Sequence, residues 1–368
     1  MRRVPSCGSP GVGRAHQSVH ARRPPATTGR RLLDAAVLAA GGASVVLLVA
    51  PGVGASARGS AATVNLSVVD IVTNLAYQNA GAAGTGIVLT STGEVLTNNH
   101  VIRGAATIKV TDVGNHRTYP ATVVGYDVSA DIAVLQLKGA SGLKTAAIGN
   151  STTVKVGQSV TATGNAGGTG GTPTATTGTV TALNRTIVAS DGSGSERLTG
   201  LIETDAVLQP GDSGGPLTNA AGRVIGIDTA ASSTFTFQSG SSEGFAIPIN
   251  RAVALARQIT AKKASATVHI GPTAFLGVDV VPSGYYRGQQ FTAGAYVLEV
   301  IPASPAEKAG IVGGDVLNSL NGRTIASSTA LTNLLLTMKP RATVTLGWVD
   351  QAGARHSGSL MLASGPPQ

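Results

Sequence analysis

The stretch Gln209-Pro210-Gly211-Asp212-Ser213-Gly214-Gly215-Pro216 places a serine between glycines and beside an acidic residue. Glycine permits backbone conformations that a side chain would forbid, so the chain can turn tightly on both sides of Ser213. Such a turn presents a serine hydroxyl beside backbone amides, and the amides of Gly211 and Ser213 are candidates for an oxyanion hole. Glycine-rich loops that contain serine are common, so the motif alone leaves a purely structural loop open as an alternative.

Two further segments supply the partners that a nucleophilic serine needs. Thr97-Asn98-Asn99-His100-Val101 places a histidine at the end of an apolar run, and Ser129-Ala130-Asp131-Ile132-Ala133-Val134-Leu135 places an aspartate at the start of a predicted strand. Each of these residues has an ordinary structural interpretation when it is taken alone. Their joint occurrence in the order His, Asp, Ser favours a catalytic triad of His100, Asp131 and Ser213.

The three segments together closely resemble the HtrA-type branch of the trypsin-like serine proteases, in particular secreted actinobacterial members with one PDZ domain. The resemblance covers roughly residues 62 to 364. It implies a mainly β fold, with a chymotrypsin-like double β-barrel at 62–262, a linker at 263–273 and a small α+β PDZ domain at 274–364.

This resemblance also implies an activity and a role for each triad residue. Asp131 is expected to orient His100, and His100 to take the proton of the Ser213 hydroxyl and pass it to the leaving amine. The expected function is cleavage of misfolded or unfolded proteins by an exported serine endopeptidase that uses no cofactor and no metal. A non-catalytic peptide-binding protein or chaperone on a protease scaffold is the alternative.

Three positions depart from the family pattern. HtrA-type enzymes usually have Asn where this chain has Asp212 and Asp228. Chymotrypsin-like zymogens have Asp at the first of these positions, where it pairs with a newly freed N-terminus, so a zymogen is a third option. Gly164-Asn165-Ala166-Gly167-Gly168 is a looser version of a family turn, and we interpret it as a flexible surface loop on the barrel.

Periodicity supports a β-rich first domain. Short Val, Ile, Thr and Leu runs between Gly, Asn and Ser recur throughout, as in sandwiches and barrels; examples are 86–90, 106–110 and 132–137. A helical period appears only after Asn250, which we expect to cap the helix. Its apolar positions are Ala252, Leu255, Ala256 and Ile259.

Residues 1–57 are predicted to form a leader. Arg30-Arg31 precede an apolar run from Ala35 to Val53, and Ala55-Ser56-Ala57 has the small-residue pattern of a cleavage site. These three features together indicate a signal peptide and export to the cell envelope or beyond. The run is near the lower length limit for spanning a bilayer, so an uncleaved membrane anchor is the alternative.

The formal net charge of +9 arises mostly in this leader, which holds seven Arg and one Asp. The rest of the chain has 20 basic and 17 acidic side chains, a net charge of +3, which gives no indication of a nucleic-acid partner. The single cysteine, Cys7, also lies in the leader, so the mature chain is expected to have no disulfide.

The C-terminal segment has PDZ features. Phe275, Leu276, Gly277 and Val278 lie in a stretch that resembles the carboxylate-binding loop and strand of HtrA-type PDZ domains. Ser304-Pro305-Ala306-Glu307 is a capping box with Pro at the first helical position. The resemblance implies that a peptide adds a strand at the sheet edge while loop amides bind its C-terminal carboxylate. A helical stripe of Leu331, Leu334, Leu335 and Met338 is expected to be mostly core.

The resemblance also suggests residues that line the substrate pocket. The residue six before the nucleophile is Val207, and the pocket walls are expected to include Ile227, Asp228, Thr229, Ala230 and Phe245. Because these residues are mostly small or apolar, the chain is expected to cleave after Val, Ala, Leu or Ile. Asp228 would change this preference if its carboxylate turned into the pocket.

The expected partners are unfolded protein substrates and C-terminal peptides. HtrA-type proteases are often trimers built through an N-terminal segment, so a homo-oligomer is a further expectation. In this chain Leu66, Ile71 and Tyr77 are the candidate contacts.

Overall fold

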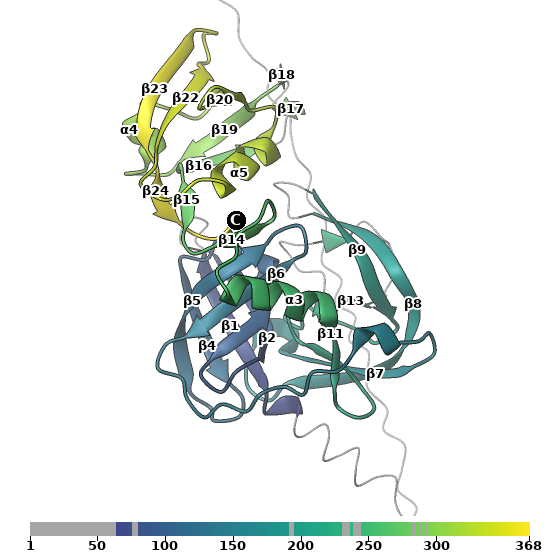
Figure 1. The fold of residues 1–368 in the computed structure, drawn as a ribbon. Helices are drawn as coiled ribbons and strands as arrows, with labels where there is room; N and C mark the ends of the chain where they lie inside the picture. The colour runs from purple at the N-terminus through teal and green to yellow at the C-terminus, as the bar shows by residue number, and fades with distance from the viewer. Residues whose placement is uncertain are drawn as a thin grey trace, which may run out of the picture. The chain divides into compact units, whose positions relative to one another are not determined.

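The structure is a computed structural model, and it describes residues 64–75, 80–190, 195–229, 236–237, 244–281, 284–286, 289–291 and 293–368 (Figure 1). The predicted leader, 1–57, and Tyr77 lie outside the described residues. Within the described part of the chain, no helix is long and apolar enough to cross a membrane.

The first barrel closes because strand β5 pairs with both β4 and β6, which completes a ring in the order β5-β4-β1-β2-β3-β6. All of these pairs are antiparallel, and side chains alternate between core and solvent, as in β4, where Ile108 and Val110 are buried while Thr107 and Lys109 are exposed. Its elements are β1 (Val68–Leu75), β2 (Ala80–Val88), β3 (Glu94–Thr97), α2 (Asn99–Ile102), β4 (Thr107–Asp112), β5 (Thr118–Asp127) and β6 (Ile132–Leu137).

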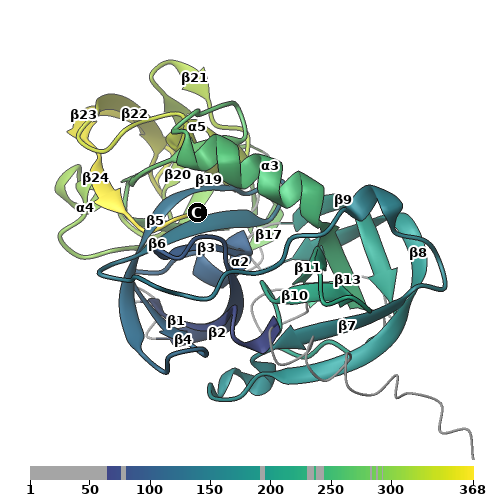
Figure 2. The ribbon, with the colours of Figure 1, turned by 60° about the horizontal axis from the view of Figure 1, so that its bottom comes forward.

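The second barrel closes in the same way, because β8 pairs with both β7 and β9 in the ring β8-β7-β10-β11-β13-β9. This ring confirms the prediction of a double β-barrel (Figure 2). Its elements are η1 (Ser151–Thr153), β7 (Ser159–Gly164), η2 (Ala166–Gly168), β8 (Thr174–Ser190), β9 (Ser195–Thr204), β10 (Pro216–Asn219), β11 (Val224–Thr229), β12 (Thr236–Phe237) and β13 (Gly244–Pro248).

Helix α3 (Ile249–Thr260) follows β13 and buries Ala252, Ala256 and Ile259 in a core cluster that contains residues of both barrels. The expectation that Asn250 caps this helix is wrong. The helix begins at Ile249, with Pro248 at the N-cap position, so Asn250 lies inside its first turn. Its side-chain amide instead donates to Asn150 at 2.8 Å, and its side-chain oxygen accepts from the Ser151 amide at 3.1 Å.

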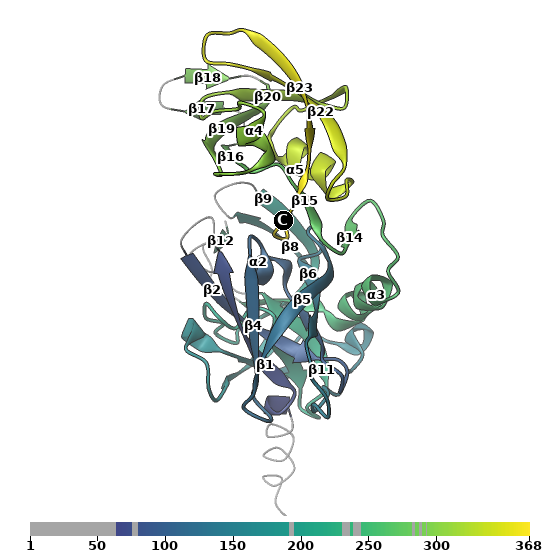
Figure 3. The same cartoon turned by 90° about the vertical axis from the view of Figure 1, so that its left-hand side faces the viewer.

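The C-terminal region forms a second core of its own around an antiparallel sheet in the order β16-β19-β20-β22-β23, with α4 and α5 against it (Figure 3). The predicted stripe is largely core, since Leu331, Leu334 and Leu335 are buried. Its elements are β15 (Thr273–Phe275), β16 (Val278–Val281), β17 (Gly284–Tyr286), β18 (Gln289–Phe291), β19 (Ala295–Val300), α4 (Pro305–Lys308), β20 (Val316–Leu320), β21 (Arg323–Thr324), α5 (Ser328–Leu336), β22 (Thr343–Val349), β23 (Arg355–Met361) and β24 (Ala363–Gly365).

The capping box at α4 forms. The Ser304 hydroxyl accepts from the Glu307 amide at 3.2 Å, while the Glu307 carboxylate accepts from the Ala303 amide at 2.6 Å, one residue before the cap.

Two observations bear on the expected linker and on assembly. Strand β14 (Val268–Ile270), inside the predicted linker, pairs with β5 and so extends the sheet of the first barrel. Ile71 is fully buried in the core of that barrel, so the expectation that it contacts another subunit is wrong. Leu66 is 40% exposed and stays a candidate contact.

Candidate active site

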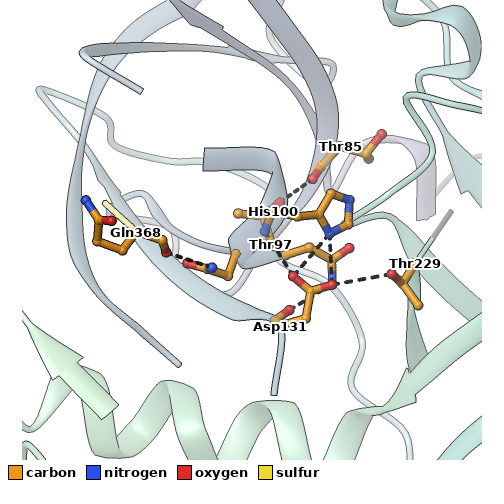
Figure 4. A network of polar contacts seen from close by, with 8 residues as sticks. Thr85, Thr97, His100, Asp131, Thr229 and Gln368 are labelled. Carbon is orange, nitrogen blue, oxygen red and sulfur yellow. Dashed lines mark hydrogen bonds and ion pairs between the residues drawn. The ribbon is translucent and has the colours of Figure 1, made fainter. Parts of the chain in front are cut away.

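Antiparallel pairing of β3 with β6 brings two of the predicted triad residues together. His100 lies on the one-turn helix α2 just after β3, and Asp131 immediately precedes β6. The buried Asp131 carboxylate accepts the backbone N–H of His100 at 2.9 Å through Oδ1, and its Oδ2 lies 2.9 Å from Nδ1 of the imidazole (Figure 4). With Nδ1 donating its proton to Asp131, Nε2 is the ring atom that accepts a proton.

Further contacts hold Asp131 in place. Its φ of +53° lies in the left-handed region, which is uncommon for residues other than glycine. The side-chain amide of Asn98 donates to the Asp131 carbonyl oxygen at 3.0 Å, and the Thr229 hydroxyl donates to Oδ2 at 3.3 Å. The carboxylate is thus fixed by its backbone and by both barrels, since Thr229 ends strand β11.

Ser213 lies in the loop between β9 and β10 and lines the same cavity as His100. This cavity has a volume of about 270 Å³, and its other lining residues are Gly81, Ala82, Ala83, Val101, Gly167, Gly168, Pro210 and Gly211. His100, Ser213 and the backbone of several glycines therefore line one cavity.

A separate cavity of about 420 Å³ is lined by residues such as Tyr126, Pro272 and Pro367, and none of the three triad residues lines it.

The loop before Ser213 is fixed by a close backbone contact with Gly167. The Pro210 carbonyl oxygen accepts the Gly167 N–H at 2.8 Å. Because the two polar groups of a trans peptide point in opposite directions, this contact turns the Gly211 N–H away from Gly167. Gly211 has a φ of +102°, and a β-carbon there would lie 2.1 Å from the Asn165 carbonyl oxygen, so only glycine fits.

Thr85, which the sequence did not single out, links this loop to the first barrel. Its hydroxyl donates to the Gly211 carbonyl oxygen at 2.7 Å and accepts the Asn165 amide at 2.9 Å. Its own amide donates to the Ser213 carbonyl oxygen at 2.8 Å, and Thr97 donates to its carbonyl oxygen at 2.7 Å (Figure 4). The fully buried Thr85 therefore positions the residues on both sides of Asp212.

The sequence predicted a flexible surface loop at 164–168, whereas the structure places part of this segment in the lining of the active-site cleft. Gly167 and Gly168 line the active-site cleft, and a β-carbon on Gly168 would meet Ala83 at 2.7 Å. The segment packs against the oxyanion loop because its glycines allow the two backbones to approach closely.

Two carboxyl groups are buried behind the nucleophile. Burial raises the pKa of Asp212, and the Gln209 amide that donates to its Oδ2 at 2.9 Å opposes this rise. Burial raises the pKa of Asp228 well above its ordinary value, and the neighbouring Asp212 raises it further. The Thr163 amide opposes the rise at Asp228 only in part.

The residues predicted for the substrate pocket lie in different surroundings. Phe245 and Asp228 are buried, and Ile227 packs in the core cluster with α3. Val207 is 55% exposed, and Ala230 lies outside the described residues. Their roles in substrate binding stay predictions.

The predicted peptide-binding residues lie at one edge of the C-terminal sheet. Strand β16, which begins at Val278, is the edge strand and pairs only with β19 in the sheet order. Gly277 has a φ of +88°, Leu276 is buried, and Phe275 is half-buried at the end of β15. Among the described residues, no group of three or more His, Cys, Asp or Glu could hold a metal ion.

Comparison with known proteins agrees with this architecture. Residues 84–227 match the family model of the trypsin-like peptidase domain, and residues 274–349 match that of the PDZ domain. Serine protease PepD of Mycobacterium tuberculosis is 35% identical over 320 residues, which cover 82% of this chain and 65% of that protein.

Two other relatives match this chain at a similar sequence identity. Serine protease Do-like HtrB of Bacillus subtilis is 38% identical over 248 residues, covering 66% of this chain and 53% of that protein. Periplasmic pH-dependent serine endoprotease DegQ of Escherichia coli is 38% identical over 273 residues, covering 72% of this chain and 56% of that protein. The chain thus spans between about half and two thirds of the length of these relatives.

Proposed function

The chain belongs to the HtrA-type trypsin-like serine proteases with a PDZ domain, and from this premise we propose that it is an exported endopeptidase that cleaves unfolded or misfolded proteins. The observation that carries this proposal is the contact between the buried Asp131 carboxylate and the imidazole of His100. Ser213 lines the same cleft as His100. A peptide-binding protein without catalytic activity would not need this constellation.

The mechanism follows from the atoms in the cleft. Nε2 of His100 takes the proton of the Ser213 hydroxyl as the oxygen attacks the substrate carbonyl carbon. The imidazolium that forms is stabilised by the Asp131 carboxylate, 2.9 Å from Nδ1. His100 then donates the proton to the leaving amine, which leaves an acyl group on Ser213, and water hydrolyses this ester by the same route.

The negative charge that develops on the carbonyl oxygen is stabilised by the amides of Gly211 and Ser213. Donors that are already oriented before the reaction need no rearrangement when the charge appears, and one such donor contributes about 10²- to 10³-fold to kcat. The orientation of the Gly211 N–H, set by the Gly167 contact to Pro210, supports this assignment.

The proposed specificity is for Val, Ala, Leu or Ile before the cleaved bond. Asp228 has no exposed surface, so it offers no accessible carboxylate to an Arg or Lys side chain. An extra methylene in an apolar pocket changes transition-state binding by only about 1 to 3 kcal/mol, so the preference should be broad.

The second domain is proposed to bind the C-termini of substrate peptides. An edge strand at β16 can accept an added peptide strand, and the turn at Leu276 and Gly277 supplies backbone amides for the carboxylate. Export to the cell envelope or beyond is supported by the leader pattern and by the word periplasmic in the name of DegQ. Assembly into a homo-oligomer, with Leu66 at a contact, belongs to the same proposal.

One experiment tests this function. Residues 58–368 and the same chain with Ser213→Ala are incubated with an unfolded protein, and the cleavage sites are mapped by mass spectrometry. We expect fragments only with the unsubstituted chain, and cuts mostly after small or branched apolar residues. Equal fragmentation by both proteins would refute the mechanism, and a majority of cuts after Arg or Lys would refute the specificity.

A further inference from the structure

The carboxyl group of Asp228 lies directly behind the nucleophile loop. Its backbone is tied to that loop twice: the Gly214 amide donates to its carbonyl oxygen at 2.9 Å, and its own amide donates to the Gly215 carbonyl oxygen at 2.8 Å. The side chain has no exposed surface, and among the described residues only the backbone amide of Thr163 stabilises its charged form. The mechanism described above makes no use of this group.

Asp212 brings a second carboxyl group to the same place. It precedes Ser213 and is 5% exposed, and its carbonyl oxygen accepts the Gly215 amide at 2.9 Å. Oδ2 accepts the Gln209 amide, whereas Oδ1 is buried against Gly164, where a β-carbon would approach it to 2.6 Å. Asp212 thus accepts a close backbone hydrogen bond and keeps slight exposure, whereas Asp228 is fully buried.

No described cation is placed to neutralise this pair. Asp228 lies in β11, next to strands β7, β10 and β13 and the loop 209–215. The one titratable side chain in these neighbouring segments is Asp212. Helix α3 also packs against β11, but its Arg251 and Arg257 are exposed, and Arg251 donates to the Thr199 carbonyl oxygen. Two buried carboxylates without a counter-charge repel each other and are poorly solvated, so one of them retains a proton.

We propose that Asp228 is a positioning residue that acts as a neutral carboxylic acid beside the Asp212 carboxylate and so keeps the loop 211–215 in its active conformation. Asp228 holds the proton because it is fully buried, whereas Asp212 is slightly exposed and its carboxylate accepts the Gln209 amide at 2.9 Å. At high pH Asp228 loses this proton to the solvent, and the two carboxylates then repel each other. This repulsion acts on Gly214 and Gly215, because both residues are hydrogen-bonded to the backbone of Asp228. The loop then loses the geometry that presents Ser213 and the oxyanion amides.

The proposal deepens the proposed function and rests on it for its effect on turnover. It predicts an alkaline fall in kcat that belongs to Asp228 and not to the triad. Asp228→Asn keeps the shape of the neutral side chain and cannot ionise, so the alkaline fall in kcat should disappear in this variant. Asp350→Asn, which removes a carboxylate in the second domain, is the matched control and should keep the fall.

The proton itself is observed by infrared spectroscopy of the full chain, which needs no turnover. At neutral pH the C=O band of a protonated carboxylic acid should be present in the unsubstituted protein, disappear on raising the pH, and be absent from Asp228→Asn but present in Asp350→Asn. Absence of the band from the unsubstituted protein, or an unchanged alkaline fall in Asp228→Asn, would overturn the proposal. Failure of every variant to cleave would refute the proposed function, and the infrared band would still decide the state of Asp228.

Discussion

The hydroxyl of Thr85 donates to the carbonyl oxygen of Gly211 at 2.7 Å and so joins a strand of the first barrel to the oxyanion loop of the second. The same hydroxyl accepts the Asn165 amide. The two barrels that supply His100 and Ser213 are therefore joined through a fully buried residue.

Thr85→Val should lower kcat by roughly 10- to 100-fold, because it leaves the Gly211 carbonyl and the Asn165 amide buried without their partner and frees the oxyanion loop. Thr85→Ser retains the hydroxyl and is the matched control, with an expected loss of less than about threefold. Steady-state hydrolysis of a peptide substrate measures both variants. A valine variant with unchanged kcat would show that the loop holds its geometry without Thr85.

Thr229→Val should have a smaller effect, of about 3- to 10-fold in kcat, because its 3.3 Å hydrogen bond is only one of the contacts that hold Asp131. Thr229→Ser should restore most of the activity, since it keeps the hydroxyl. The same peptide assay serves, with thermal unfolding as a check on the fold. An equal loss in the serine and valine variants would assign Thr229 to packing and not to Asp131.

The stability of the protein should depend on pH through Asp228. Its pKa in the folded state is raised above the ordinary 3.8, so between those two values the folded chain binds more protons than the unfolded chain. The free energy of unfolding therefore falls as the pH rises through this window. Asp228→Asn should show a weaker fall and should be more stable than the unsubstituted chain at neutral and alkaline pH. Urea unfolding at a series of pH values measures this difference, and parallel curves for the two proteins would contradict it.

Peptide binding by the second domain should be sensitive to Gly277. A β-carbon at this position would lie 2.1 Å from that of Ser304, in addition to the strain of its positive φ. Gly277→Ala should therefore weaken binding of a peptide with a free apolar C-terminus by about tenfold or more. Gly353→Ala, at a similar φ of +83° with open space around it, is the matched control and should bind normally.

Calorimetry measures this binding, and an amidated peptide tests carboxylate recognition in the unsubstituted chain. Equal affinity for the free and amidated peptides would refute carboxylate binding. Equal affinity of the two glycine variants would show that the loop geometry at Gly277 does not matter.

Local sequence was sufficient to predict a β-rich first domain, because strand patterns and tight turns are encoded by neighbouring residues, whereas the double barrel was implied by the resemblance to HtrA-type proteases. The contact between His100 and Asp131 was likewise predictable, since both segments resembled a known arrangement. Asn250 was predicted wrongly because helix boundaries depend on the preceding strand, here ending at Pro248, as well as on the capping residue.

Thr85 could not be identified in the same way. It lies in an ordinary strand, and its four hydrogen bonds reach residues 12 to 128 positions away, so no local pattern marks them. The flanking glycines were the only signal: a β-carbon on Gly84 would meet Val101 at 2.6 Å and the Ser213 carbonyl oxygen at 3.2 Å. Burial of Asp228 was also inaccessible, because a lone Asp in an apolar strand does not reveal which group it faces.

The central claim, that Ser213 is a nucleophile activated by His100, is tested most directly by its reaction with an organophosphonate fluoride. The serine oxygen bonds to phosphorus as fluoride leaves, and the intact mass records one phosphonyl group per chain. We predict one adduct on Ser213 of the unsubstituted protein, none on Ser213→Ala, and labelling slower by roughly a thousandfold or more with His100→Ala. Equal labelling of the Ser213→Ala variant, or no effect of His100→Ala on the rate, would contradict the account.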